Sequence, residues 1–162
     1  MAGLLLIIAA LLLMFAVFAG ISAAPWVPTR KRDVSALLDD CELEPGDKFV
    51  ELGCGDGRLL AEAAKRGAKA VGYEINPLLW LVATVRNIAR LSKVRVRLGS
   101  LWRADISNAD VVMLFLMPKA MTRLERKISS EMKPGSRLVC YIFGLPGRRP
   151  SIKRKKWSIY KL

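Results

Sequence analysis

The sequence predicts one α/β domain with a doubly wound, mostly parallel sheet, preceded by a single N-terminal transmembrane helix. Short and nearly continuous apolar runs alternate with helical stretches, as in parallel sheets that are covered on both faces by crossover helices. A glycine-rich turn follows the first of these runs, and the first 24 residues carry no charged side chain. We therefore expect a membrane anchor at residues 1–24, a basic linker at 25–32 and one folded domain at 33–162.

The N-terminal segment, residues 3–24, consists mostly of Leu, Ile, Ala, Phe and Val. About 20 such residues in a helix span a bilayer core of about 30 Å. Arg30, Lys31 and Arg32 follow this segment, and such cations stay on the cytoplasmic side. The sequence thus predicts a single-pass protein with a cytoplasmic domain. Residues 22–24 also resemble a signal-peptide cleavage site, so removal of the segment is the alternative.

The elements of the domain follow from the residue patterns in order. A short helix is expected at 33–41 with Asp33 as its N-cap, before a Pro-Gly turn at 45–47. The apolar runs predict strands at 48–52, 70–74, 94–98, 110–115 and 136–143, and the stretches between them predict helices at 58–66, 78–91 and 119–132. The alternating pattern of residues 156–162 predicts a final strand at the sheet edge.

The formal net charge of +13 lies entirely in the predicted domain and linker. Beside a membrane, basic clusters hold a domain against anionic lipid headgroups, and nucleic-acid binding or a simply solvated surface are the alternatives. The second cluster lies near the C-terminus and comprises Arg148, Arg149, Lys153, Arg154, Lys155, Lys156 and Lys161.

The composition excludes several kinds of site. The chain has no histidine, and its 3 cysteines form no C-x-x-C pair, so we expect no metal site of the Cys/His type. A Ser-His or Cys-His nucleophilic pair cannot form within the chain. Cys140 stands in an apolar run and is expected to be a buried small hydrophobe.

The glycine-rich turn, residues 51–58, carries the main chemical signal. Its three glycines allow a sharp turn and a close approach of ligand to backbone, and the helix that follows offers free N–H groups. In a dinucleotide fingerprint the third glycine would stand where this chain has Arg58. Glu51 and Asp56 would repel a pyrophosphate. They suit a cofactor with a positive centre and an ammonium group, such as S-adenosylmethionine.

Further candidates stand where later strands end, because ligands bind at the carboxyl ends of such strands. Glu74 ends the second run, where a carboxylate can accept both ribose hydroxyls of an adenosine; the alternative is that it caps the next helix. Ser100 follows the third run, and Asp105 stands nearby. The expected cofactor-binding residues are Glu51, Gly53, Cys54, Gly55, Asp56, Gly57, Glu74, Ile75, Ser100 and Leu101, and the expected substrate lip is Leu116, Met117 and Pro118, for which helix initiation is the alternative.

The motifs E-L-G-C-G-D-G-R and G-Y-E-I-N-P resemble those of class I, Rossmann-like, S-adenosylmethionine-dependent methyltransferases. Together with P-W-V-P-T after the apolar N-terminus and L-W-R-A-D-I-S at 101–107, they resemble more closely the membrane-associated protein-lysine methyltransferases that modify the adenine nucleotide translocase and the c-ring protein of ATP synthase. The resemblance implies a protein substrate, which for such an enzyme is itself a membrane protein. In such enzymes the loop after the third strand often binds the adenine, so the resemblance implies Ser100 as a candidate for the adenine amino group, with Asp105 as a nearby substitute. The chain departs from the pattern at Ser100, where an acid is expected, and in its short basic segment after Pro146.

Two other functions remain open at this point. One is methylation of RNA or of a small molecule, which the basic segment near the C-terminus favours. The other is a non-catalytic membrane adaptor that has kept the fold. A lysine acceptor must lose its proton, and without a histidine that proton passes to water, a carboxylate or a backbone carbonyl. The sequence does not assign a catalytic residue.

Overall fold

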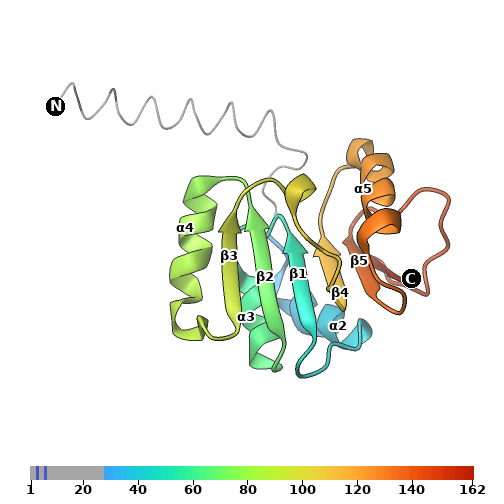
Figure 1. Ribbon diagram of the computed structural model, residues 1–162, viewed down its shortest axis with the longest axis horizontal. Coiled ribbons are helices and arrows are strands. Elements are labelled where there is room, and N and C mark those ends of the chain that lie inside the picture. Colours follow the sequence, from blue (N-terminus) through green and yellow to red (C-terminus); the bar gives the residue numbers. More distant parts are fainter. Residues whose placement is uncertain (1–2, 4–5, 7–27) are drawn as a thin grey trace.

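The computed structural model describes residues 3, 6 and 28–162 of the chain (Figure 1). The predicted transmembrane helix, residues 3–24, lies outside the described residues except for Gly3 and Leu6, so it stays a prediction. Within the described part of the chain, no helix is long and apolar enough to cross a membrane.

One sheet of seven strands forms the centre of the domain, in the order β3-β2-β1-β4-β5-β7-β6. Strands β1 to β5 are parallel, and β7 runs antiparallel to both of its neighbours. The doubly wound, mostly parallel sheet is therefore confirmed. The strands are β1 (Lys48–Leu52), β2 (Lys69–Glu74), β3 (Val94–Leu98), β4 (Val111–Leu114), β5 (Arg137–Tyr141), β6 (Ile152–Lys153) and β7 (Trp157–Lys161).

The predicted position of the last strand is wrong, because β7 lies between β5 and β6 and not at the edge. Ile159 pairs with Val139 on one side and with Ile152 on the other. The edge strand β6 has two residues, too few to show an alternating pattern in the sequence.

Helices cover the sheet from both sides (Figure 1). Helices α2 (Lys31–Asp40), α3 (Arg58–Lys65) and α4 (Pro77–Arg86) contribute buried residues to the apolar core on one face. Helix α5 (Pro118–Glu131) packs on the other face through Met121, Leu124 and Ile128. Two short 3₁₀ turns, η1 (Ile88–Arg90) and η2 (Leu101–Arg103), stand in the connections.

The start of α2 corrects one prediction. Arg30 occupies the N-cap position, and Asp33 lies in the first turn of the helix. Its buried carboxylate accepts hydrogen bonds from the Tyr141 hydroxyl at 2.8 Å and the Lys156 ammonium at 2.6 Å. The hydrogen bond from Lys156 lowers the pKa of Asp33, although burial acts in the opposite direction. The hydrogen bond from Tyr141 lowers this pKa further. Asp33 thus ties α2 to the sheet.

The predicted long helix at 78–91 is divided in two by Asn87. Its side-chain amide donates to the carbonyl oxygens of Gly57 at 3.1 Å and Ala83 at 2.9 Å. Helix α4 ends there, and the 3₁₀ turn η1 follows. A buried amide with partners on two helices fixes the end of α4 against the start of α3.

The sheet order brings the predicted site to one edge. Because β1 lies between β2 and β4, the connections after β1 and β4 diverge to opposite faces, and this divergence opens a crevice at the carboxyl ends of the strands. Glu74 ends β2 at this edge, and the glycine turn, Ser100 and the segment 116–118 follow other strands that end there.

Candidate functional site

The glycine turn folds back against the end of β2. Gly53, Gly55 and Gly57 have φ angles of +85°, +54° and +71°, a left-handed conformation that favours glycine. The backbone N–H groups of Gly53 and Cys54 both donate to the Tyr73 carbonyl oxygen, at 2.8 and 3.0 Å. The predicted sharp turn is confirmed, and its backbone lies open to the crevice at Gly53.

Glu74, at the end of β2, is held in a fixed position. One carboxylate oxygen accepts the N–H of Gly55 and the other accepts that of Asn76, each at 2.8 Å. The cap of α4 is provided by Asn76, whose side chain accepts from Leu78 and Leu79, so the capping role considered for Glu74 is wrong. Each oxygen of Glu74 keeps a further acceptor site, as two ribose hydroxyls require.

Glu51, at the end of β1, is a buried acid without a partner. The residue is 7 % exposed, and its Oε2 atom has no hydrogen bond within the described residues. Burial raises the pKa of Glu51 well above its ordinary value, and the negative charges of Asp56 and Glu74 raise it further. A buried acceptor left without a donor calls for a ligand, and a cationic ligand would also relieve the electrostatic cost.

This raised pKa predicts a pH dependence that Glu51→Gln should remove. As the pH rises above the ordinary glutamate value, the unfolded chain releases this proton while the folded chain keeps it. The free energy of unfolding therefore falls through that window. We expect Glu51→Gln to be more stable than the wild type above the window and equal to it below, as measured by urea unfolding from about pH 4 to pH 8. If the free energy of unfolding changed with pH in the same way in both proteins, the raised pKa of Glu51 in the folded chain would be contradicted.

Asp56 and Cys54 contribute to the structure of the glycine turn more than to a ligand site. Burial would raise the pKa of Asp56, but the hydrogen bonds and charge of Arg58, with the charge of Arg86, hold it below its ordinary value. Arg58 and Arg86 lie at 2.7 and 3.0 Å from its Oδ2. The predicted repulsion of a pyrophosphate by Asp56 is therefore offset by these arginines. Cys54 is buried, and burial raises the pKa of its thiol.

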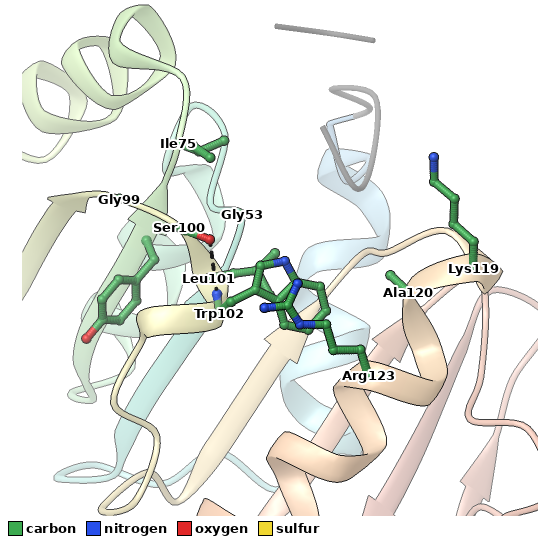
Figure 2. A pocket seen from close by; sticks show the side chains of 10 residues that line it. Gly53, Ile75, Gly99, Ser100, Leu101, Trp102, Lys119, Ala120 and Arg123 are labelled. Atoms are coloured by element: carbon green, nitrogen blue, oxygen red, sulfur yellow. Dashed lines mark hydrogen bonds between the residues drawn. The ribbon is translucent and has the colours of Figure 1, made fainter. Parts of the chain in front are cut away.

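A cleft of about 430 Å³ opens beside the glycine turn, toward the ends of β2 and β3 (Figure 2). Ser100 lies on its wall, and its hydroxyl accepts the N–H of Trp102 at 3.3 Å. Asp105 does not line this cleft; it binds the N–H and hydroxyl of Ser107 at 3.0 and 2.7 Å. The lining residues are Gly53, Tyr73, Ile75, Gly99, Ser100, Leu101, Trp102, Lys119, Ala120 and Arg123.

The far wall of the cleft contains residues that the sequence did not predict. The Arg123 guanidinium lies 4.1 Å from the centre of the Trp102 ring, and Lys119 stands one turn earlier on α5 (Figure 2). The sequence held one signal for these two residues. Lys119 and Arg123 are four residues apart at the start of a helix, so their side chains lie on one face of it.

The predicted substrate lip falls on the start of α5. Leu116 is 2 % exposed and belongs to the core, so its side chain is not available to a substrate. Met117 is the N-cap of α5 and Pro118 its first residue, which agrees with helix initiation. Neither lines the cleft, whereas Lys119 and Ala120 do.

Comparison with known proteins agrees with this geometry. The profile of the ANTKMT methyltransferase domain matches residues 51–152. A protein-lysine N-methyltransferase of Saccharolobus islandicus is 35% identical over 130 residues, covering 78% of this chain and 81% of that protein. The adenine nucleotide translocase lysine N-methyltransferase of Mus musculus is 34% identical over 131 residues, and the match covers 78% of this chain but 56% of the mouse protein.

A solved structure supports the same fold and cofactor. The RNA methyltransferase from Salinibacter ruber, in complex with S-adenosyl-L-homocysteine, superposes with a TM-score of 0.78 at 31% identity. The match covers 83% of this chain and 92% of that one.

Proposed function

The chain belongs to the ANTKMT methyltransferase domain family and is an S-adenosylmethionine-dependent methyltransferase, and we propose that it methylates protein lysine while attached to a membrane. The observation that carries the acceptor class is the 35% identity to a protein-lysine N-methyltransferase over 81% of that protein's length. The family membership disfavours the non-catalytic adaptor.

We assign the cofactor contacts from the geometry of the turn. Bound S-adenosylmethionine supplies a methyl group activated by its sulfonium. The fixed carboxylate of Glu74 accepts the ribose hydroxyls, and the unpartnered Oε2 of Glu51 accepts the ammonium group of the amino-acid part. Ile75 and Ser100 border the adenine. The protein contributes mainly alignment, which in favourable systems is worth up to about 7–11 kcal/mol.

The membrane attachment is supported by the sequence. Residues 3–24 carry no charge, and three cations follow at 30–32. A chain held in this way keeps its domain on the cytoplasmic side. Its basic surface then faces anionic headgroups at short range.

Methylation of RNA is the second candidate, and two observations favour it. One is the likeness to the Salinibacter ruber RNA methyltransferase. The other is a basic recess along β1 to β3, which has Asp105 as the single acid among its lining residues. Five cations line this recess: Lys48, Lys69, Lys93, Arg95 and Arg97.

A labelling experiment separates these acceptors. The full chain is incubated with methyl-tritiated S-adenosylmethionine and with membrane, soluble-protein and RNA fractions of a lysate. We expect label in the membrane fraction that protease releases and ribonuclease does not. Label released by ribonuclease would establish the RNA alternative in place of protein-lysine methylation, and label confined to small molecules would overturn both.

A further inference from the structure

Helix α4 presents an apolar face to the outside of the domain. We define the α4 apolar face as the exposed aliphatic side chains of the helix and of the turn after it. Val85 is 60 % exposed and Ile88 63 % exposed. The members of the α4 apolar face are Leu78, Leu81, Val82, Val85, Ile88 and Leu91.

The spacing of these residues shows that they share one side of the helix. Residues 78, 81, 82 and 85 recur with the three- and four-residue steps of a helical stripe. The opposite side faces the sheet: Ala83 is buried, and the Trp80 indole N–H donates to the Val96 carbonyl oxygen at 3.2 Å. The helix is thus apolar on its inner and its outer side, and from Pro77 to Val85 it carries no charged residue. A helix that is apolar all round is normally covered.

The distribution of exposed apolar side chains over the domain strengthens this point. Ten large hydrophobic residues are exposed within the described part of the chain. Six of them form the α4 apolar face, and two more, Ile75 and Leu98, lie at the ends of β2 and β3. Such concentration in one place marks an interaction surface, whereas scattered exposed residues do not.

We propose that the α4 apolar face is a second membrane contact, seated in the interfacial region of an anionic bilayer. Cations border the α4 apolar face. Arg86 and Arg90 stand at the end of α4 and in η1, and Lys93 follows. An apolar helical face bordered by cations suits the boundary between acyl chains and anionic headgroups.

The path of the chain into the domain also supports a membrane contact at α4. The Thr29 carbonyl oxygen accepts from Arg58 at 3.2 Å, so the chain enters the domain beside the start of α3. Arg58 and Arg86 share the carboxylate of Asp56, which links this entry point to the end of α4. The chain therefore enters the domain on the side where α4 ends, and the apolar residues 3–24 precede this entry point in the sequence.

This inference rests on the membrane attachment proposed above, and a depth measurement tests it in the full chain. Val85→Cys is labelled with an environment-sensitive maleimide, and Ser129→Cys on the exposed side of α5 is the matched control. The native cysteines are buried, and burial raises the pKa of Cys41 to about 11 and that of Cys140 to about 12. The label therefore reacts with the introduced thiolate.

The labelled chains are reconstituted in phosphatidylcholine–phosphatidylglycerol vesicles. At position 85 we expect quenching by acyl-chain nitroxide lipids to exceed quenching by aqueous iodide by roughly threefold, and at position 129 we expect the reverse. A position 85 probe that iodide quenches as it does position 129 would overturn the proposal, as would a chain that does not bind the vesicles. A probe shielded from both quenchers would instead assign the face to a second copy of the chain.

The same samples separate this proposal from the proposed transferase function. Methyl transfer to protein is measured on each labelled chain. Transfer with an iodide-accessible position 85 would overturn the α4 contact alone. A lipid-quenched position 85 without any methyl transfer would support the contact and contradict the enzyme's proposed acceptor.

Discussion

Replacing Glu74 by alanine is expected to weaken S-adenosylmethionine binding about 100-fold, which corresponds to about 2.7 kcal/mol. A hydrogen bond to a charged group contributes about 1.5–3 kcal/mol, and we assign two ribose hydroxyls to this carboxylate. The substitution also frees the N–H groups of Gly55 and Asn76, which Glu74 holds at 2.8 Å. The loop that presents the cofactor site is therefore loosened as well. Isothermal titration calorimetry of the two proteins measures the difference.

Two variants control this experiment. Glu62→Ala removes an acid on α3 that pairs with Lys65 on the surface, and its affinity for the cofactor should be unchanged. Glu74→Gln keeps the shape and one acceptor oxygen, so its affinity should lie between those of the wild type and the alanine variant. Unaltered affinity in Glu74→Ala would refute the ribose assignment.

Replacing Gly57 by alanine is expected to lower the free energy of unfolding by about 2–5 kcal/mol. The residue has a φ of +71°, and a Cβ atom there would lie 2.7 Å from Asn87 Nδ2 and 2.9 Å from Ala83 Cβ. The left-handed conformation costs a non-glycine residue about 1–2 kcal/mol, and overpacking adds about 1–3 kcal/mol. Urea unfolding monitored by circular dichroism gives the value.

Gly46→Ala is the matched control, because Gly46 has a φ of +94° and no heavy atom within 4 Å of the added Cβ. It should show the conformational cost alone, about 1–2 kcal/mol. Equal losses in the two variants would mean that the junction of α3 and α4 yields to the added methyl group. The close packing inferred at Gly57 would then be wrong.

Much of the fold could be predicted from the sequence because parallel strands buried on both faces form short apolar runs. The five parallel strands lie within two residues of their predicted positions. The position of β7 could not be predicted, since pairing with β6 depends on two residues separated from it by a turn. The end of α4 depends on the side chain of Asn87, which bonds to Gly57 on another helix.

The candidate site was predictable where a backbone pattern determines it. The three glycines and the two strand-end acids, Glu51 and Glu74, occupy the positions expected of them. Contacts between side chains were not predictable. Asp56 is neutralised by two arginines, one of which comes from α4, and Arg123 reaches the cleft from α5. Such contacts depend on tertiary packing that a local motif does not encode.

Transfer of methyl groups from S-adenosylmethionine to protein lysine is the activity proposed for this chain, and peptide mass spectrometry detects it at the level of single lysines. The full chain and its Glu74→Ala variant are each incubated with S-adenosylmethionine and membranes that have been stripped of endogenous methylation activity. We expect methylated lysine in a membrane-fraction protein with the wild type and a strong reduction with the variant. Methyl groups found on RNA nucleotides, with every lysine unmodified, would contradict it.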